Sequence, residues 1–150
     1  MPQSLSYNYM HLVFSTKNRE PNIHTDIEQK LYEYMAGICK NLESTAIQIG
    51  GYTDHIHILF LLSKKITLIK FVEEVKKSSS KWIKTQGTQY SNFYWQGGYG
   101  AFSVNPKQVE IVKNYILNQK EHHSKKSFQQ EYIAFLKEYN VDYDERYVWD

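Results

Sequence analysis

The chain has 150 residues, of which 41% are hydrophobic and 23% are charged, values typical of one folded domain rather than of a disordered or fibrous protein. Its longest apolar run, residues 56–62, is too short to cross a membrane, and its single cysteine excludes an intrachain disulfide framework. The first residues do not resemble a secretory leader, so we expect one intracellular domain over residues 1–150. The net charge of +2 does not by itself indicate a polyanionic partner.

The first half of the chain predicts the order strand, helix, strand, strand. Aromatic and branched residues favour a strand over residues 7–16. Residues 25–42 place apolar side chains at helical spacing, behind a threonine and an aspartate that can cap a helix. Strands are then predicted at residues 45–52, with a bend or bulge at Gly50–Gly51, and at residues 55–62. The last strand is apolar on both faces apart from two histidines, which is typical of a central strand.

The second half predicts one more helix and strand, followed by two helices. Thr67 can cap a helix to about residue 85, and the glycine-interrupted aromatic segment 94–104 favours a bulged strand or a short hairpin. Helices are expected from about 107 to 123, after Asn-Pro, and from about 128 to 139, after Ser127. The resulting β-α-β-β-α-β order predicts an α+β, ferredoxin-like (RRM-like) antiparallel sheet with two helices on one face and C-terminal helices added.

Two histidines flank one apolar residue in His55-Ile56-His57. On a strand they project from the same face, where two imidazoles can hold one divalent metal ion. The alternative is a pair of hydrogen-bonded histidines on a sheet surface. Asp54, directly before the pair, is either a partner that orients an imidazole or a turn residue.

Tyr115 and Gln119 are four residues apart on the predicted helix 107–123, and are therefore neighbours on its surface. A phenol beside a neutral oxygen donor can supply a nucleophile and a metal ligand. The alternative is that Tyr115 packs in the core with its hydroxyl at the rim. His122 and His123 end the same helix, where such side chains suit the terminal carbonyl groups, so neither is assigned as a ligand.

Charge is unevenly distributed along the chain. Residues 64–84 contain seven lysines and two glutamates, a net charge of +5, whereas residues 131–150 contain six acidic and two basic residues, a net charge of −4. A lysine-rich helix face is either a solvated surface or a nucleic-acid contact. The candidate DNA-binding residues are Lys17, Arg19, Lys70, Lys77, Lys81 and Lys84. Four aromatic residues are either a stacking platform for unpaired bases or core: Tyr94, Trp95, Tyr99 and Phe102.

These features, in this order, resemble the HUH single-tyrosine transposases, the TnpA-type enzymes of bacterial insertion sequences, in the REP-associated tyrosine transposase superfamily. His55-Ile56-His57 matches the histidine–hydrophobe–histidine signature, and residues 115–119 (YILNQ) resemble the helix that carries the tyrosine and the metal-binding glutamine. Residues 16–19, residues 98–104, the two histidines at 122–123 and residues 147–149 also match.

The resemblance implies a transposase that cleaves and rejoins single-stranded DNA through a 5′-phosphotyrosine intermediate. Tyr115 would be the nucleophile, and His55, His57 and Gln119 would hold Mg²⁺ or Mn²⁺. The resemblance also implies recognition of DNA hairpins at element ends and a homodimer with composite active sites, in the cytoplasm of a bacterium or archaeon. No membrane partner is expected.

Three other interpretations remain open from the sequence. A single-stranded nucleic-acid-binding module would bind DNA without metal dependence or a covalent adduct. A domesticated family member would nick host repeats without moving an element. A metal-dependent hydrolase would use water in place of Tyr115, although two histidines and a glutamine form a neutral, weakly binding site.

Overall fold

A four-stranded antiparallel sheet forms the centre of the molecule in a computed structural model, which describes residues 2–150. The strands are β1 (Asn8–Ser15), β2 (Ala46–Tyr52), β3 (His55–Leu62) and β4 (Gly100–Ser103), in the spatial order β2-β3-β1-β4. This order confirms the ferredoxin-like α+β prediction and makes β3 and β1 the two central strands.

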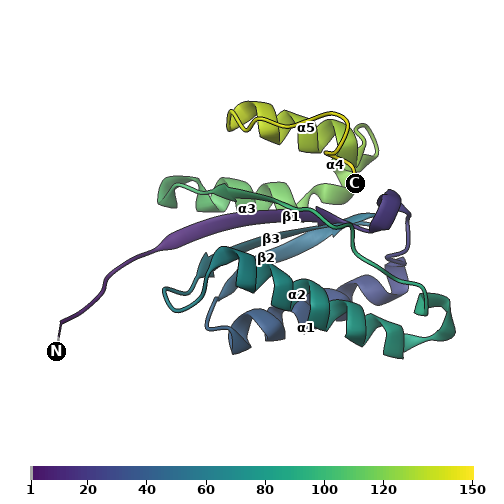
Figure 1. The fold of residues 1–150 in the computed structure, drawn as a ribbon, viewed down its shortest axis with the longest axis horizontal. Helices are drawn as coiled ribbons and strands as arrows, with labels where there is room; N and C mark the ends of the chain where they lie inside the picture. Colours follow the sequence, from purple (N-terminus) through teal and green to yellow (C-terminus); the bar gives the residue numbers. More distant parts are fainter. Residues whose placement is uncertain (1) are drawn as a thin grey trace.

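Two helices, α1 (Thr25–Asn41) and α2 (Leu68–Ile83), cover one face of the sheet (Figure 1). Thr67 caps α2 by accepting a hydrogen bond from the backbone N–H of Lys70, as its position predicts. The main hydrophobic core lies between this face and the helices, where the rings of Phe60 on β3 and Phe71 on α2 stack 4.1 Å apart. Each fully buried side chain of this size contributes about 1.5–3 kcal/mol to folding.

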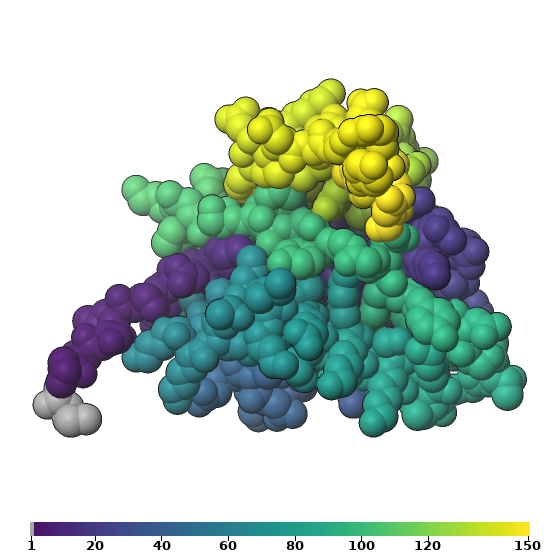
Figure 2. All heavy atoms as spheres, in the orientation of Figure 1, coloured from purple at the N-terminus to yellow at the C-terminus, as the bar shows by residue number. Residues whose placement is uncertain are grey.

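The opposite face carries α3 (Val109–Leu117), α4 (Gln119–His123) and α5 (Phe128–Glu138), so the fold has three layers (Figure 1). In the space-filling view, α5 and the C-terminal residues lie on the side of the molecule away from α2 (Figure 2). Ser127 and Gln130 form a capping box at the start of α5. No helix among residues 2–150 is long and apolar enough to span a membrane.

The prediction of one helix over 107–123 is wrong. A 3₁₀ turn at Pro106–Gln108 precedes α3, and the chain then breaks at Asn118, whose φ of −97° and ψ of 20° are not helical. Asparagine is a weak helix former. The Gln119 side chain donates a hydrogen bond to the Tyr115 carbonyl group at 3.4 Å, which offsets part of the cost of the break.

The predicted strand over 94–104 is also longer than the strand that forms. Only residues 100–103 pair with β1, while Trp95 forms an isolated bridge with Thr16. Between them, the Lys76 amine of α2 donates hydrogen bonds to the carbonyl groups of Gln96 and Gly98, at 2.8 and 2.7 Å. The Lys76 side chain therefore supplies hydrogen bonds to this segment that a neighbouring strand would otherwise supply.

The aromatic residues around this segment do not share one stacking surface. Phe102 is 3% exposed and packs against Phe135 of α5. Trp95 packs edge-on against Phe14 on the other side of the sheet, while Tyr94 is 53% exposed beneath the Lys84 amine. The core interpretation is correct for most of the set.

Gly50 on β2 marks a close approach of α3 to the sheet, rather than a bulge. The irregularity in β2 lies between Ala46 and Gln48. A Cβ atom at Gly50 would lie 2.8 Å from the side chain and 2.9 Å from the carbonyl oxygen of Ile116. The missing side chain therefore lets the backbone of α3 rest directly on β2.

We expect Gly50→Val to lower the free energy of unfolding by about 1–3 kcal/mol, because the Ile116 carbonyl group cannot move without displacing α3. Gly37→Ala in α1, where an added Cβ meets nothing within 4 Å, is the matched control and should raise stability by about 0.5–1 kcal/mol. Urea unfolding of both variants measures the difference. Equal stability of Gly50→Val and the wild type would contradict this close approach.

Candidate active site

His55 and His57 lie on the face of β3 that α3, α4 and α5 cover, and both side chains are fully buried. The alternating neighbours Ile56 and Ile58 point into the main core on the other face. The predicted common face of the two histidines is therefore confirmed. Because β3 is paired on both sides, the backbone that carries the two imidazoles is held rigidly.

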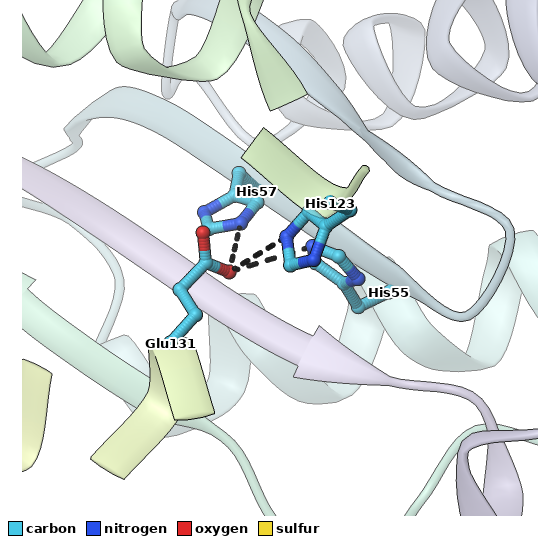
Figure 3. Close-up of side chains that lie close together, drawn as sticks. All are labelled: His55, His57, His123 and Glu131. Carbon is cyan, nitrogen blue, oxygen red and sulfur yellow. Dashed lines mark hydrogen bonds and ion pairs between the residues drawn. The ribbon is translucent and has the colours of Figure 1, made fainter. Parts of the chain in front are cut away.

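The Glu131 carboxylate of α5 and the His123 imidazole of α4 lie beside the two imidazoles (Figure 3), and the Gln119 amide of α4 joins them. Glu131 Oε1 lies 3.0 Å from His57 Nε2 and 3.5 Å from His55 Nε2. Gln119 Oε1 lies 3.0 Å from His55 Nε2, and His123 Nε2 lies 3.0 Å from that same amide oxygen and 3.4 Å from Glu131 Oε1. The break at Asn118 thus leaves Gln119 facing the histidines.

Tyr115 lies beside this cluster in the same chain. Its hydroxyl donates a hydrogen bond to Glu131 Oε2, the carboxylate oxygen that does not face His57. Its ring is 5.8 Å from the His57 ring and 5.7 Å from Phe135. All four predicted site residues therefore contact the Glu131 carboxylate: His55, His57, Gln119 and Tyr115.

Further polar groups hold the outer nitrogens of the imidazoles. Asp54 Oδ1 lies 2.7 Å from His55 Nδ1, so Asp54 contacts the histidine that follows it. His11 on β1 is 3% exposed, and its Nε2 lies 2.8 Å from His57 Nδ1. These contacts fix the orientation of both rings.

Burial and the Glu131 carboxylate determine the electrostatics of the cluster. Burial lowers the pKa of His57. Burial opposes ionisation of Glu131, but hydrogen bonds from His123 and His57 outweigh it and hold the Glu131 pKa below its usual range. The pKa of Tyr115 is raised by burial and by the charge of Glu131, so the phenol keeps its proton in this state. For His123, burial lowers the pKa, but contact with Glu131 outweighs it and raises the value.

A groove of about 550 Å³ leads to Tyr115 from the side. Its walls come from β1, the segment after β4, α3 and α5, and Tyr115 and Phe135 are among its lining residues. The two histidines are therefore covered by the helices, whereas Tyr115 borders a groove that opens to solvent.

A family model described as IS200-like transposase matches residues 4–119, which is most of the chain. The matched region includes His55, His57, Tyr115 and Gln119. The chain belongs to the IS200-like transposase family.

Two solved structures resemble this transposase in fold. One is a candidate transposase from Deinococcus radiodurans, with a TM-score of 0.62 and 17% identity over 79% of this chain and 98% of that one. The other is a REP-associated tyrosine transposase bound to a REP hairpin, with a TM-score of 0.60 and 16% identity over 82% of this chain and 74% of that one. No curated protein matches the sequence.

Two residues of the cluster, Glu131 and His123, escaped the sequence predictions. In retrospect, the sequence holds one signal for Glu131: it is a charged residue among the apolar residues Phe128 and Tyr132 on the inner face of α5. In the structure it is only 3% exposed. His123 lies four residues after Gln119, on the same side of a helix turn.

The basic residues predicted to bind DNA occupy two separate places in the transposase. Lys17 and Arg19 follow β1, whose last residue pairs with His55, and Arg19 donates a hydrogen bond to the Trp149 carbonyl group at 3.1 Å. The others lie on α2 or directly after it, across the sheet from the histidines (Figure 1): Lys70, Lys77 and Lys81 in the helix, and Lys84 at its C-cap.

We expect Asp54→Ala to change the tautomer of His55. The ionised Asp54 carboxylate only accepts hydrogen bonds, so it keeps the hydrogen on Nδ1. Without it, the hydrogen should move to Nε2, where Gln119 and Glu131 oxygens can accept it. The ¹⁵N NMR shifts of the histidine side chains, measured without metal, report the tautomer, and the exposed Asp142→Ala is the control. An unchanged Nδ1–H form in Asp54→Ala would contradict the assignment.

Proposed function

We propose that this transposase cleaves and rejoins single-stranded DNA at element ends through a 5′-phosphotyrosine intermediate, with Tyr115 as the nucleophile. The observation that carries the proposal is the meeting of four side chains at one place on the sheet. His55 contacts the Gln119 amide oxygen, His57 contacts the Glu131 carboxylate, and the Tyr115 hydroxyl donates a hydrogen bond to that same carboxylate.

The donor set fits a divalent metal ion. His55, His57 and Gln119 offer two imidazole nitrogens and an amide oxygen from buried side chains, and the carboxylate of Glu131 supplies a negative charge beside them. A bound Mg²⁺ or Mn²⁺ would polarise the scissile phosphate and stabilise the charge that develops in the transition state. The chain's own residues would bind and orient the remaining participants.

Tyr115 would form the new bond to phosphorus while the bond from phosphorus to the 3′-oxygen breaks. The phenol loses its proton and the departing 3′-oxygen gains one, so DNA is left with a free 3′-hydroxyl and a 5′-phosphate ester on Tyr115. The exchange conserves the number of phosphate ester bonds, and rejoining therefore needs no nucleotide cofactor. Since the phenol is protonated in the present state, DNA binding would have to loosen its hydrogen bond to Glu131.

The DNA strand would reach Tyr115 through the groove beside α3 and α5. A hairpin near the element end would contact the protein through basic side chains. Lys17 and Arg19 are candidates because they follow the end of β1 that pairs with His55. The α2 lysines would bind DNA backbone farther from the reaction centre, because the sheet separates them from the histidines. The hairpin-bound tyrosine transposase of similar fold supports a hairpin as the partner.

The geometry favours an active site assembled within one chain, in contrast to the composite site implied by the family resemblance. Tyr115 already lies next to His57 of its own chain. A homodimer stays a prediction, to be measured by light scattering.

The proposal is tested by incubating the protein with labelled single-stranded DNA from its genomic flanks, with and without Mg²⁺ or Mn²⁺. We expect a denaturation-resistant adduct that needs the metal ion. Tyr115→Phe should lose the adduct completely and keep hairpin binding, because only the nucleophilic oxygen is removed. Tyr147→Phe, an exposed tyrosine, is the matched control and should form the adduct normally.

Each competing activity predicts a different result. Hairpin binding with no adduct at any metal concentration indicates a non-catalytic binding module. DNA cleavage without an adduct indicates a hydrolase that uses water. Full activity in His57→Ala or under strong chelation would exclude the metal site, and an adduct in Tyr115→Phe would assign the nucleophile to another tyrosine.

Mixing two inactive variants distinguishes a site within one chain from a shared site. A mixture of Tyr115→Phe and His57→Ala should stay inactive, since neither chain then holds both a phenol and a complete histidine pair. Recovery of about a quarter or more of wild-type adduct, measured after co-refolding at equal concentration, would instead demonstrate composite sites.

A further inference from the structure

His55 directs its Nε2 toward two oxygen atoms, while its Nδ1 contacts a carboxylate. Its Nδ1 lies 2.7 Å from the Asp54 carboxylate, which only accepts hydrogen bonds, so Nδ1 carries the hydrogen of the neutral ring. The lone pair at Nε2 then faces Gln119 Oε1 at 3.0 Å and Glu131 Oε1 at 3.5 Å. With the hydrogen on Nδ1, three electron-rich atoms meet, and a cation bound between them makes the contact favourable.

His123 repeats this arrangement from α4. Its Nδ1 lies 2.7 Å from the Lys126 carbonyl oxygen, which again assigns the hydrogen to Nδ1. Its Nε2, the nitrogen that a metal ion can bind in the neutral ring, faces Gln119 Oε1 at 3.0 Å and Glu131 Oε1 at 3.4 Å. An imidazole whose outer nitrogen donates to a carboxylate or a carbonyl group is the usual arrangement of a metal-bound histidine.

The spacing of the donor atoms also suits a metal ion. The ligand atoms of His55, His57, His123 and Glu131 all lie within 4.8 Å of one another (Figure 3). Glu131 Oε1 is 3.0–3.5 Å from the Nε2 atoms of the three histidines. Ligands that are each about 2.0–2.1 Å from one ion are separated by about 3.0 Å at right angles and about 3.4 Å at tetrahedral angles.

We propose that Glu131 and His123 are metal ligands together with His55 and His57, so that three imidazoles and one carboxylate bind a divalent first-row transition ion. The inference rests on the proposed metal-dependent function and adds Glu131 and His123 to its ligand set of His55, His57 and Gln119. Imidazole nitrogens favour such ions, whereas Mg²⁺ prefers oxygen ligands. The ion then joins β3 to α4 and α5.

The second oxygen of Glu131 gives this ligand a further role. Oε1 faces the histidines, while Oε2 accepts the hydrogen bond of the Tyr115 hydroxyl. One carboxylate therefore links the ion to the nucleophile, and Glu131 acts as a positioning residue for Tyr115. Binding of the ion and placement of the phenol are coupled through the two carbon–oxygen bonds of one carboxylate.

Binding of Co²⁺ to the full chain tests the ligand set without measuring DNA cleavage. Calorimetry gives the affinity, and the visible absorption of bound Co²⁺ reports its ligands. We expect Glu131→Gln and His123→Ala each to weaken binding at least about tenfold and to alter the absorption. Glu138→Gln, an exposed carboxylate on the same helix, and His24→Ala, an exposed histidine, are matched controls and should bind as the wild type does.

Circular dichroism and thermal unfolding without metal establish that each variant is folded. If a variant fails to fold, NMR of the wild type replaces it, because Zn²⁺ should shift the side-chain ¹⁵N resonance of His123 in step with those of His55 and His57. An unmoved His123 resonance overturns its assignment as a ligand.

The remaining outcomes separate this inference from the proposed function. Wild-type affinity in Glu131→Gln and His123→Ala, with binding lost in His57→Ala, overturns the larger ligand set and leaves a site of His55, His57 and Gln119. Absence of Co²⁺, Mn²⁺ and Mg²⁺ binding by the wild type overturns both the larger ligand set and the metal dependence of the proposed function.

Discussion

Two imidazoles lie fully buried on the central strand of the sheet, and their polar edges need partners. A buried polar group without one costs several kilocalories per mole. The α1–α2 side of β3 is apolar, so the polar partners of His55 and His57 come from the β2–β3 turn, from β1 and from the second helical layer: Asp54, His11, Gln119 and Glu131. Polar contacts at the histidines, as much as apolar packing, therefore determine where α4 and α5 rest on the sheet.

The break between α3 and α4 shows how this requirement shapes the backbone. Gly50 lets α3 lie directly on β2, which places Tyr115 beside the histidines. The chain then leaves the helical path at Asn118, and Gln119 turns its amide oxygen to His55 while its nitrogen donates to Glu131 Oε2 at 3.2 Å. A local loss of helical hydrogen bonding is thus balanced by contacts inside the site.

The two faces of the sheet differ in the groups that they carry. The face under α1 and α2 holds the larger apolar core, and the outer surface of α2 carries the lysines. The face under α3, α4 and α5 holds smaller apolar clusters around the polar site and the groove that reaches Tyr115. The small net charge conceals this division, because Glu131, counted with the acidic C-terminal residues, is a buried member of the site.

The sequence by itself determined the strand and helix order, the shared face of His55 and His57, and the match to a tyrosine transposase, because alternation, helical spacing and motif order are local properties. It did not reveal the break at Asn118, the short β4, or the approach of His123 and Glu131 to the histidines. Glu131 is separated from His57 by 74 residues, and only the packing of α5 on the sheet joins them. Tertiary packing determines which acidic side chain is buried away from water, and the local sequence pattern does not predict which one it is.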